Sequence, residues 1–304
     1  MSSTPVGKTS RVAAYVALTK PRIIELLLVT TVPVMFAAAG GLPPLRSVVV
    51  TVLGGTLAAA GANVFNCVLD ADIDAQMRRT AGRPTVTGVV SRVRATVFGV
   101  LLSIASIVLL WLGANALSSL LAAAAIATYV VGYTMILKRR TAQNIVWGGI
   151  AGCFPVLIGW TAVTGHPAAP AWLLFALVFF WTPAHYWPLS VKYREDYRNA
   201  HVPMLGAVAS PVRVSASVLA YVAATAATAV AYGVVAQAGV LYWSVSSVAG
   251  LWFAYEAMGL RRVALSTTAS QDRVAGRAMR VFHVSISYLA LVFLAVGIDP
   301  FLSQ

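Results

Sequence analysis

Carboxylate and carboxamide side chains recur at helical spacing near the end of an apolar segment. Four of them, at spacings of three, four and four residues, are Asn63, Asn66, Asp70 and Asp74. A helix would project these four from nearly one face, whereas Asp72 would point to the opposite side. Two carboxylates one turn apart, with amides beside them, offer the hard oxygen ligands that Mg²⁺ prefers. Because Mg²⁺ usually completes its shell with waters and substrate phosphates, the spacing predicts a site for a magnesium-bound diphosphate, with Asp70 and Asp74 as metal ligands.

Basic residues follow these carboxylates directly. Arg78, Arg79 and Arg83 could neutralise a diphosphate through charge-assisted hydrogen bonds. The alternative is that the aspartates are ordinary solvated charges at a helix end. Asn63 and Asn66 argue against that alternative, because they lie deeper in the apolar segment, where polar groups are costly and usually face a cavity or a partner.

A second polar segment contains Lys192 and Asp196, one helical turn apart. Such a pair is most often a surface ion pair. The functional interpretation gains weight because we expect this segment on the same side of a membrane as the first. Asp196 could then supply a further oxygen ligand to the metal, and Lys192 could hold phosphate oxygens. Lys138 and Arg194, from basic stretches on that side, are further candidates for binding the diphosphate.

Two groups within apolar stretches have an open assignment. The first group is His185, Tyr186 and Trp187. His185 is either a hydrogen-bonded histidine among interfacial aromatic residues, or it contacts a porphyrin together with its neighbours, which imidazole chemistry permits. Glu256 is either a structural partner of an arginine or a site residue, and the spacing does not choose between them.

The composition is that of a membrane protein. Of 304 residues, 59% are hydrophobic and only 10% are charged, and the mean hydropathy is +0.81, whereas soluble domains carry about 25% charged residues. The net charge of +13 does not indicate nucleic-acid binding, because the basic residues cluster in short stretches between apolar runs. Cys67 and Cys153 lie in apolar stretches and are expected to be small buried hydrophobes without a disulfide.

The apolar runs have the length that spans a bilayer as a helix. Within lipid, backbone polar groups must be satisfied internally, and the runs lack the alternation of a β-barrel. We therefore expect an all-α, polytopic membrane protein with about nine transmembrane helices around a central cavity. The predicted spans cover residues 23–41, 47–69, 93–112, 117–137, 144–163, 171–191, 214–236, 240–260 and 281–297.

Lysine and arginine set the predicted orientation. With the N-terminus in the cytoplasm and the sides alternating, only Arg46 falls outside, which is the asymmetry that the positive-inside rule expects. An odd number of spans puts the C-terminus outside. The longest internal loops, 70–92 and 192–213, then face the cytoplasm. No linker interrupts the chain, so 1–304 is predicted to be a single domain with a short cytoplasmic N-terminal segment, 1–22.

At these residues the sequence resembles protohaem IX farnesyltransferases (haem O synthases), within the UbiA-type intramembrane prenyltransferase superfamily. The superfamily pattern is Asn66-x-x-x-Asp70-x-x-x-Asp74. The narrower resemblance to the haem-modifying branch rests on four segments: Leu18-Thr-Lys-Pro-Arg22, Asp70-x-Asp-Ile-Asp-x-x-Met77-x-Arg-Thr80-x-x-Arg-Pro84, His185-Tyr-Trp and Asp196-Tyr-x-x-Ala-x-x-Pro-Met-Leu205.

The sequence departs from the broad superfamily at one informative position. Members that prenylate aromatic acids or quinone precursors usually carry a second Asp-x-x-x-Asp motif. Here Lys192 stands at its first position and Asp196 is retained, a pattern that resembles the haem branch. His201 stands where that branch often has glycine, and nothing is based on this difference.

The resemblance implies a reaction. Farnesyl diphosphate would bind with its diphosphate held by Mg²⁺, Asn66, Asp70 and Asp74, while lysines and arginines stabilise the leaving diphosphate. A vinyl carbon of haem b would attack the allylic carbocation, and water would complete the hydroxyethylfarnesyl group of haem O. The enzyme is expected in the inner cell membrane with its active site facing the cytoplasm. A haem A synthase or an oxidase-assembly protein is a conceivable partner, but the sequence itself does not show one.

Other functions fit parts of the pattern. A UbiA-type enzyme acting on a quinone precursor or another lipid acceptor would need the same diphosphate site. A transporter would also place polar residues within spans, but the acidic residues here gather on one side with no matching external site. A passive haem-binding scaffold would not need the diphosphate motif.

Overall fold

The computed structural model describes residues 10–302, and this part of the chain contains helices and no strand. The all-α prediction is therefore confirmed. Residues 1–9 of the predicted N-terminal segment lie outside the described residues. The rest of that segment contains α1 (Arg11–Thr19), a helix absent from the predicted spans. Ser10 caps α1, because its side-chain oxygen accepts a hydrogen bond from the backbone N–H of Ala13.

Nine long helical segments make up the bundle in the described part of the chain. Seven are uninterrupted: α2 (Pro21–Ala39), α3 (Leu45–Leu69), α5 (Arg92–Gly113), α9 (Ala169–Lys192), α12 (Pro211–Val235), α13 (Val240–Leu265) and α14 (Gln271–Ile298). In the other two, α6 (Ala116–Ala127) continues as the π-helix η1 (Thr128–Leu137), and α7 (Asn144–Gly148) continues through the 3₁₀ turn η2 (Gly149–Cys153) into α8 (Phe154–Thr164). The short elements are α4 (Ala71–Gln76), α10 (Arg194–Asn199), α11 (Leu205–Val208) and η3 (Asp299–Phe301).

Seven of these segments, among the residues described, are long and apolar enough to cross a membrane. They confirm a multi-pass membrane protein. The segments α9 and α13 are long enough, at 24 and 26 residues, but their sequences are more polar, with a histidine and prolines in α9 and Glu256 in α13. The count of nine spans therefore stays a prediction.

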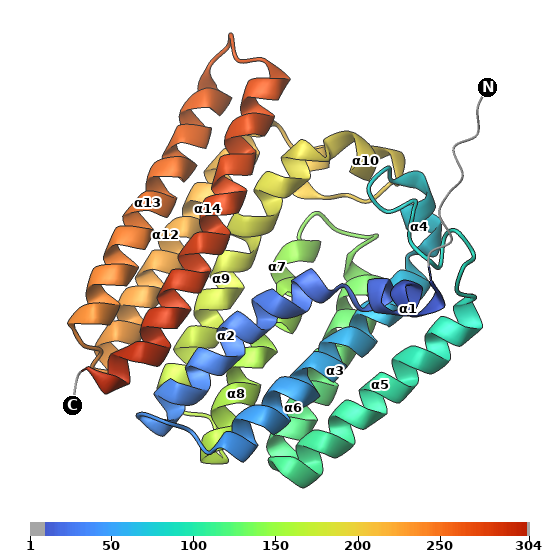
Figure 1. Ribbon diagram of the computed structural model, residues 1–304. Coiled ribbons are helices and arrows are strands. Elements are labelled where there is room, and N and C mark those ends of the chain that lie inside the picture. The colour runs from blue at the N-terminus through green and yellow to red at the C-terminus, as the bar shows by residue number, and fades with distance from the viewer. Residues whose placement is uncertain (1–9, 303–304) are drawn as a thin grey trace.

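The long helices lie side by side in one bundle (Figure 1), and the contacts between them form a closed circuit. Each contacts the next in the order α3, α5, α6, α8, α9, α12, α13, α14 and α2, and α2 returns to α3. The first and the last long helices thus close the bundle. Gly297 permits this closure, because a Cβ atom there would lie 2.9 Å from Pro33 on α2. Contacts of α2 with α8 and of α9 with α14 cross the circuit and fill part of its middle.

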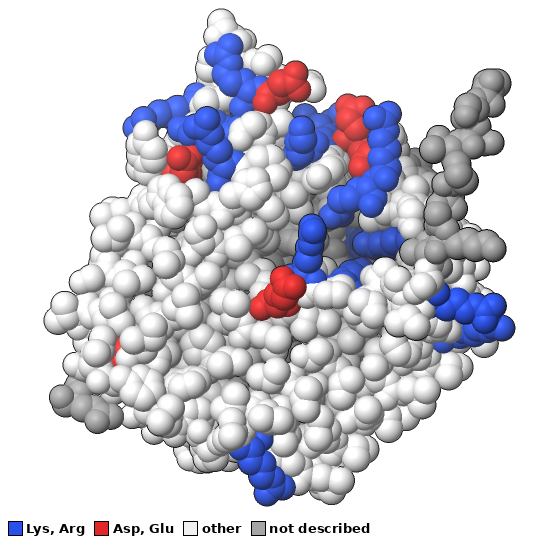
Figure 2. Space-filling view, viewed as in Figure 1, with Lys and Arg blue, Asp and Glu red and all other residues white. Residues whose placement is uncertain are grey.

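The charged side chains gather at one end of the bundle. Figure 2 shows most Lys and Arg over the end at which Figure 1 labels α4 and α10. Arg46 lies at the other end, where its guanidinium donates to the carbonyl oxygen of Leu112. This distribution agrees with the charge asymmetry of the sequence, while the assignment of that end to the cytoplasm stays a prediction.

The surroundings of Glu256 and of the two cysteines show what these three residues do in the fold. Arg277 Nη1 lies 2.8 Å from Glu256 Oε2, so Glu256 is the structural partner of an arginine between α13 and α14. Cys67 and Cys153 are free and buried, as the sequence predicts.

Candidate functional site

The predicted helix over the carboxylates breaks at its first aspartate. The helix α3 ends at Leu69, Asp70 has φ −93° and ψ 7°, and α4 begins at Ala71. The break is small, because the backbone N–H of Asp74 still donates to the carbonyl oxygen of Asp70 at 2.8 Å. The two acidic side chains therefore keep roughly their helical spacing. Both are almost completely buried, and so are Asn63 and Asn66. All four side chains therefore lie inside the bundle, in contrast to the exposed Asp72.

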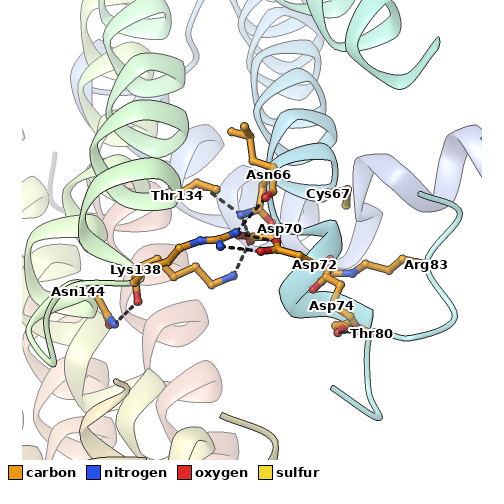
Figure 3. A network of polar contacts seen from close by, with 12 residues as sticks. Asn66, Cys67, Asp70, Asp72, Asp74, Thr80, Arg83, Thr134, Lys138 and Asn144 are labelled. Carbon is orange, nitrogen blue, oxygen red and sulfur yellow. Dashed lines mark hydrogen bonds and ion pairs between the residues drawn. The ribbon is translucent and has the colours of Figure 1, made fainter. Parts of the chain in front are cut away.

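Asp70 lies at the centre of a polar network at this end of the bundle (Figure 3). Its Oδ2 atom accepts hydrogen bonds from Asn66 Nδ2 at 2.7 Å and from Lys138 Nζ at 2.5 Å. Its Oδ1 atom is buried and has no hydrogen-bond partner among the described residues. Arg139 Nη2 is 4.0 Å from that oxygen. The carboxylate thus has one hydrogen-bonded oxygen and one oxygen that makes no hydrogen bond and has Arg139 only at ion-pair distance.

The other two aspartates differ sharply in environment. Asp74 is buried and pairs with Arg83 through Oδ2. Asp72 is exposed, and Arg139 donates to both of its oxygens, at 2.7 and 2.8 Å. The hydrogen bonds from Arg139 lower the pKa of Asp72 to about 2. Asp72 therefore points away from the buried pair, as the helical spacing predicts.

Asn63 has a structural contact in this arrangement. Its Nδ2 atom donates to the carbonyl oxygen of Thr19 at 2.9 Å, which fastens the end of α1 to α3. Cys67 Sγ lies 3.8 Å from the carbonyl oxygen of Leu18 and extends the same contact. The predicted role of Asn63 in binding the diphosphate stays a prediction, and its amide nitrogen already donates to Thr19.

Lys20 is a site residue that the sequence analysis does not single out. It lies at the junction of α1 and α2, and its Nζ atom donates to Asn66 Oδ1 at 2.6 Å. Burial lowers the pKa of Lys20 to about 8, and the nearby cations Arg83 and Lys138 act in the same direction. The one available signal was its place in the Leu18-Thr-Lys-Pro-Arg22 segment, which carries the family resemblance.

The π-helix η1 delivers two further residues to the network. Asn66 Nδ2 also donates to Thr134 Oγ1, at 3.0 Å, and Lys138 follows directly after η1. Asn144 supports Lys138, because its Nδ2 atom donates to the Lys138 carbonyl oxygen at 3.3 Å. π-Helical segments are rare and are frequently found at functional sites. Nothing in the apolar pattern of this segment distinguishes a π-helix from an α-helix, so Thr134 was missed.

The second polar segment lines a cavity at the same end of the molecule. This cavity has a volume of about 560 Å³. Its walls are formed by Arg78, Arg79, Lys192, Tyr193, Glu195, Asp196 and Asn199. The guanidinium of Arg79 lies over the ring of Tyr193, 5.2 Å from its centroid. The structure therefore brings the arginines after α4 together with Lys192 and Asp196, although the two segments are far apart in the sequence.

Arg194 does not join this cavity wall. Its Nε and Nη2 atoms donate to the carbonyl oxygens of Gly206 and Ala209, both at 2.6 Å. Arg198 donates in the same way to Ala207. These contacts hold the loop around α11 against α10. The predicted role of Arg194 in binding diphosphate gains no contact from this geometry.

His185 is packed inside the bundle between two aromatic rings. It stacks on Trp181, with centroids 4.3 Å apart, and on Phe282, with centroids 4.6 Å apart. Its Nδ1 atom is 2.7 Å from Ser285 Oγ on α14. Tyr186 touches it edge-on, and Trp187 is buried against Tyr221. This arrangement favours the hydrogen-bonded histidine over the porphyrin contact.

The buried carboxylates fit a divalent cation. A buried carboxylate oxygen without a donor is costly unless a cation or another partner satisfies it, and Asp70 Oδ1 is such an atom. Within residues 10–302, no three Asp, Glu, His or Cys side chains converge to hold a metal by themselves, so Asp196 does not lie with Asp70 and Asp74. Mg²⁺ usually takes only one or two carboxylates and completes its shell with waters and substrate phosphates, which this site can accommodate.

Comparison with known proteins identifies relatives over nearly the whole chain. The model of the UbiA prenyltransferase family matches residues 27–297. A protein named Protoheme IX farnesyltransferase from Renibacterium salmoninarum is 52% identical, over 98% of this chain and 93% of its own length. The protein of that name from Streptomyces coelicolor is 50% identical, over 99% of this chain and 94% of its own length.

Solved structures share the fold at much lower identity. A UbiA homologue from Aeropyrum pernix in its apo form has a TM-score of 0.71 at 20% identity, over 92% of this chain and 98% of that one. A UbiA homologue from Archaeoglobus fulgidus bound to GPP and Mg²⁺ has a TM-score of 0.65 at 16% identity, over 92% of this chain and 99% of that one. At these identities the likeness shows the fold.

Proposed function

The chain belongs to the UbiA prenyltransferase family, and we propose that it transfers the farnesyl group of farnesyl diphosphate to a vinyl group of haem b, giving haem O and diphosphate. The observation that carries this proposal is the buried pair Asp70 and Asp74, set among Lys20, Arg83 and Lys138 at one end of the bundle. Carboxylates for a metal and cations for phosphate oxygens are what a prenyl diphosphate requires. Identity of about half over the full chain to proteins named Protoheme IX farnesyltransferase supports haem as the acceptor.

Asp70 and Asp74 would hold Mg²⁺, whereas Asp196, the third ligand predicted from the sequence, lies apart from this pair on the wall of the neighbouring cavity. When bound, the metal supplies positive charge that stabilises the diphosphate as it leaves. The Asp70 carboxylate is suited to this role because its Oδ1 atom has no competing donor in the part of the chain described. Asp72 has no such role, because Arg139 occupies both of its oxygens.

The cations around the two segments bind the diphosphate. Lys138 and Arg83 lie against the buried carboxylates, and Arg78, Arg79 and Lys192 line the cavity beside them. As the bond between C1 of the farnesyl group and oxygen breaks, negative charge grows on the diphosphate. Fixed cations in a site poor in water stabilise this charge without having to reorganise. Arginine is well suited to the task, because its guanidinium can hold two phosphate oxygens at once.

The acceptor then supplies the electrons for the new bond. The terminal vinyl carbon of haem b attacks C1 of the farnesyl cation, and the positive charge moves to the vinyl carbon attached to the porphyrin. Water adds there and loses a proton, which leaves a hydroxyl group beside the new carbon–carbon bond. The bilayer setting suits both substrates, because the farnesyl chain and the porphyrin face are apolar.

We place the site at the cytoplasmic face of the inner cell membrane, on the basis of the lysine and arginine asymmetry. Single cysteines introduced into the loops 70–92 and 192–213 test this orientation. In intact cells they should resist a membrane-impermeant maleimide and react only after the membrane is opened. Ready labelling of both loops from outside would reverse the topology.

The proposed reaction is tested with purified enzyme in lipid vesicles, farnesyl diphosphate, Mg²⁺ and haem b. Mass spectrometry should find haem b increased by one farnesyl group and one hydroxyl group. Parallel reactions contain a quinone precursor in place of haem b. Prenylation of the quinone precursor with no haem O would replace haem as the acceptor, and release of diphosphate without either product would argue against prenyl transfer.

A further inference from the structure

Lys20 occupies a backbone conformation that rarely suits a lysine. It ends α1 and begins α2 with φ 54° and ψ 65°, in the left-handed region. Glycine is the usual residue where a helix ends in this way, because other residues are strained there. Pro21 follows and disfavours the right-handed helical conformation for the residue before it. A non-glycine residue in this strained conformation points to a use for its side chain.

The side chain of Lys20 sets the orientation of the Asn66 amide. Lys20 Nζ has only hydrogens to donate, so the atom it contacts at 2.6 Å must be the amide oxygen of Asn66. The amide nitrogen then faces Asp70 Oδ2 at 2.7 Å and Thr134 Oγ1 at 3.0 Å. The hydroxyl of Thr134 donates to the Tyr129 carbonyl oxygen at 2.9 Å and is therefore free to accept. A flipped amide would set its nitrogen against an ammonium and its oxygen against a carboxylate.

We propose that Lys20 is a positioning residue for the metal site: through Asn66 it fixes the Asp70 carboxylate so that Oδ1 remains available to a divalent cation. Asn66 satisfies Oδ2 together with Lys138, and Oδ1 has no donor within residues 10–302. In this arrangement Asn66 orients Asp70 as a hydrogen-bond donor, instead of offering its own oxygen to the metal. This inference rests on the magnesium site of the proposed function.

Charge alone and positioning predict opposite effects of removing Lys20 on the binding of a divalent cation. Lys20 is itself a cation near the proposed metal position, so its removal would strengthen the binding of a divalent cation if charge alone mattered. Loss of a residue that orients a metal ligand has the opposite effect and typically weakens metal binding by about 10–100-fold. Weaker binding in a variant without the ammonium is therefore a signature of positioning.

The experiment measures Mn²⁺ binding to the purified full-length protein by electron paramagnetic resonance, without farnesyl diphosphate or haem. The variants are Lys20→Met, which removes the ammonium, Lys20→Arg, which can still donate to Asn66, and Lys20→Gly, which suits the left-handed backbone. Arg22→Met is the matched control, because Arg22 is an exposed cation two residues away. Thr134→Val and Thr134→Ser test the hydrogen bond that the Asn66 amide donates to Thr134. Thermal unfolding midpoints are measured for every protein.

Lys20→Met and Lys20→Gly should weaken Mn²⁺ binding by about tenfold or more, with Lys20→Arg and Arg22→Met close to wild type. Thr134→Val should act in the same direction as Lys20→Met, and Thr134→Ser should bind normally. Lys20→Gly should unfold at the wild-type temperature or above it, which separates the effect from a loss of stability. Equal or tighter Mn²⁺ binding by Lys20→Met and Lys20→Gly would overturn the positioning role. If the wild-type protein itself does not bind Mn²⁺, the proposed metal site and this inference both fail.

Discussion

The guanidinium of Arg79 lies over the ring of Tyr193, 5.2 Å from its centroid, and this contact joins the two polar segments of the chain. Arg79 follows the helix that carries Asp74, and Tyr193 lies between Lys192 and Arg194. The contact keeps the arginines of the first segment beside Lys192 in the wall of the cavity. Residues far apart in the sequence thereby become one phosphate-binding surface.

Arg79→Ala should raise the KM for farnesyl diphosphate by about fivefold to thirtyfold, because a cation–π contact of about 1–2 kcal/mol and a phosphate-directed charge are both lost. Arg79→Lys keeps the charge but stacks less well, so its KM for farnesyl diphosphate should lie between those of the wild type and Arg79→Ala. Steady-state kinetics with each substrate varied in turn provide the measurement. A change in the KM for haem b, with the value for farnesyl diphosphate kept, would place Arg79 on the acceptor instead.

Lys192 and Arg194 should differ although they are two residues apart. Lys192→Met removes a charge from the cavity wall and should raise the KM for farnesyl diphosphate about tenfold or more, the effect of one charge-assisted hydrogen bond. Arg194→Met removes the donors to Gly206 and Ala209 and should instead lower the thermal unfolding midpoint. Kinetics and unfolding are compared for both variants. A normal unfolding midpoint together with a raised KM in Arg194→Met would restore its predicted role on the diphosphate.

His185→Phe keeps the aromatic stacking but loses the hydrogen bond to Ser285. We expect a loss of stability of about 1 kcal/mol, the usual value for one such bond, with the haem absorption spectrum and the KM for haem b unchanged. Haem titration of the purified variant checks this. A changed spectrum or a greatly weakened haem affinity would show that His185 contacts the porphyrin.

Turnover should depend on pH through Lys20. Burial lowers the pKa of this side chain in the folded protein to about 8 from its usual 10.5, so the ammonium is lost as pH rises through about 8. The folded state then binds fewer protons than the unfolded state between pH 8 and 10.5, and the free energy of unfolding should rise with pH across that window. Activity should fall over the same window, because the charge-assisted hydrogen bond to Asn66 weakens. Lys20→Arg, whose guanidinium stays protonated, should hold its activity to higher pH, and identical profiles would exclude Lys20 as the titrating group.

Local sequence patterns predicted those parts of the site that depend on spacing within one helix. Apolar runs located the long helices, and the spacing of Asn66, Asp70 and Asp74 correctly separated the buried carboxylates from Asp72. The break at Asp70 did not disturb this, because the hydrogen bond between Asp74 N and Asp70 O preserves the turn. The helix α1 was not expected, because its nine residues are too few to span a bilayer.

Contacts between distant segments could not be predicted in the same way. Lys20 reaches Asn66 across 46 residues, and Thr134 reaches it across 68. No local period encodes such distances. Arg194 was assigned to the diphosphate because of its charge, but the fold of the loop around α11 decides its contacts.

The central claim is that a buried carboxylate holds the magnesium diphosphate. Comparing Asp70→Asn with Asp72→Asn tests this claim most directly. Both variants remove one negative charge from the same segment, but Asp70 is fully buried and Asp72 is more than half exposed. Haem O formation is measured by mass spectrometry in matched vesicles over a range of Mg²⁺ concentrations. Asp70→Asn should lose at least about two orders of magnitude in rate, the scale of losing an essential electrostatic contact in the transition state, while Asp72→Asn stays within a few-fold of wild type at every Mg²⁺ concentration. Equal losses in the two variants, or full activity of Asp70→Asn, would contradict the account.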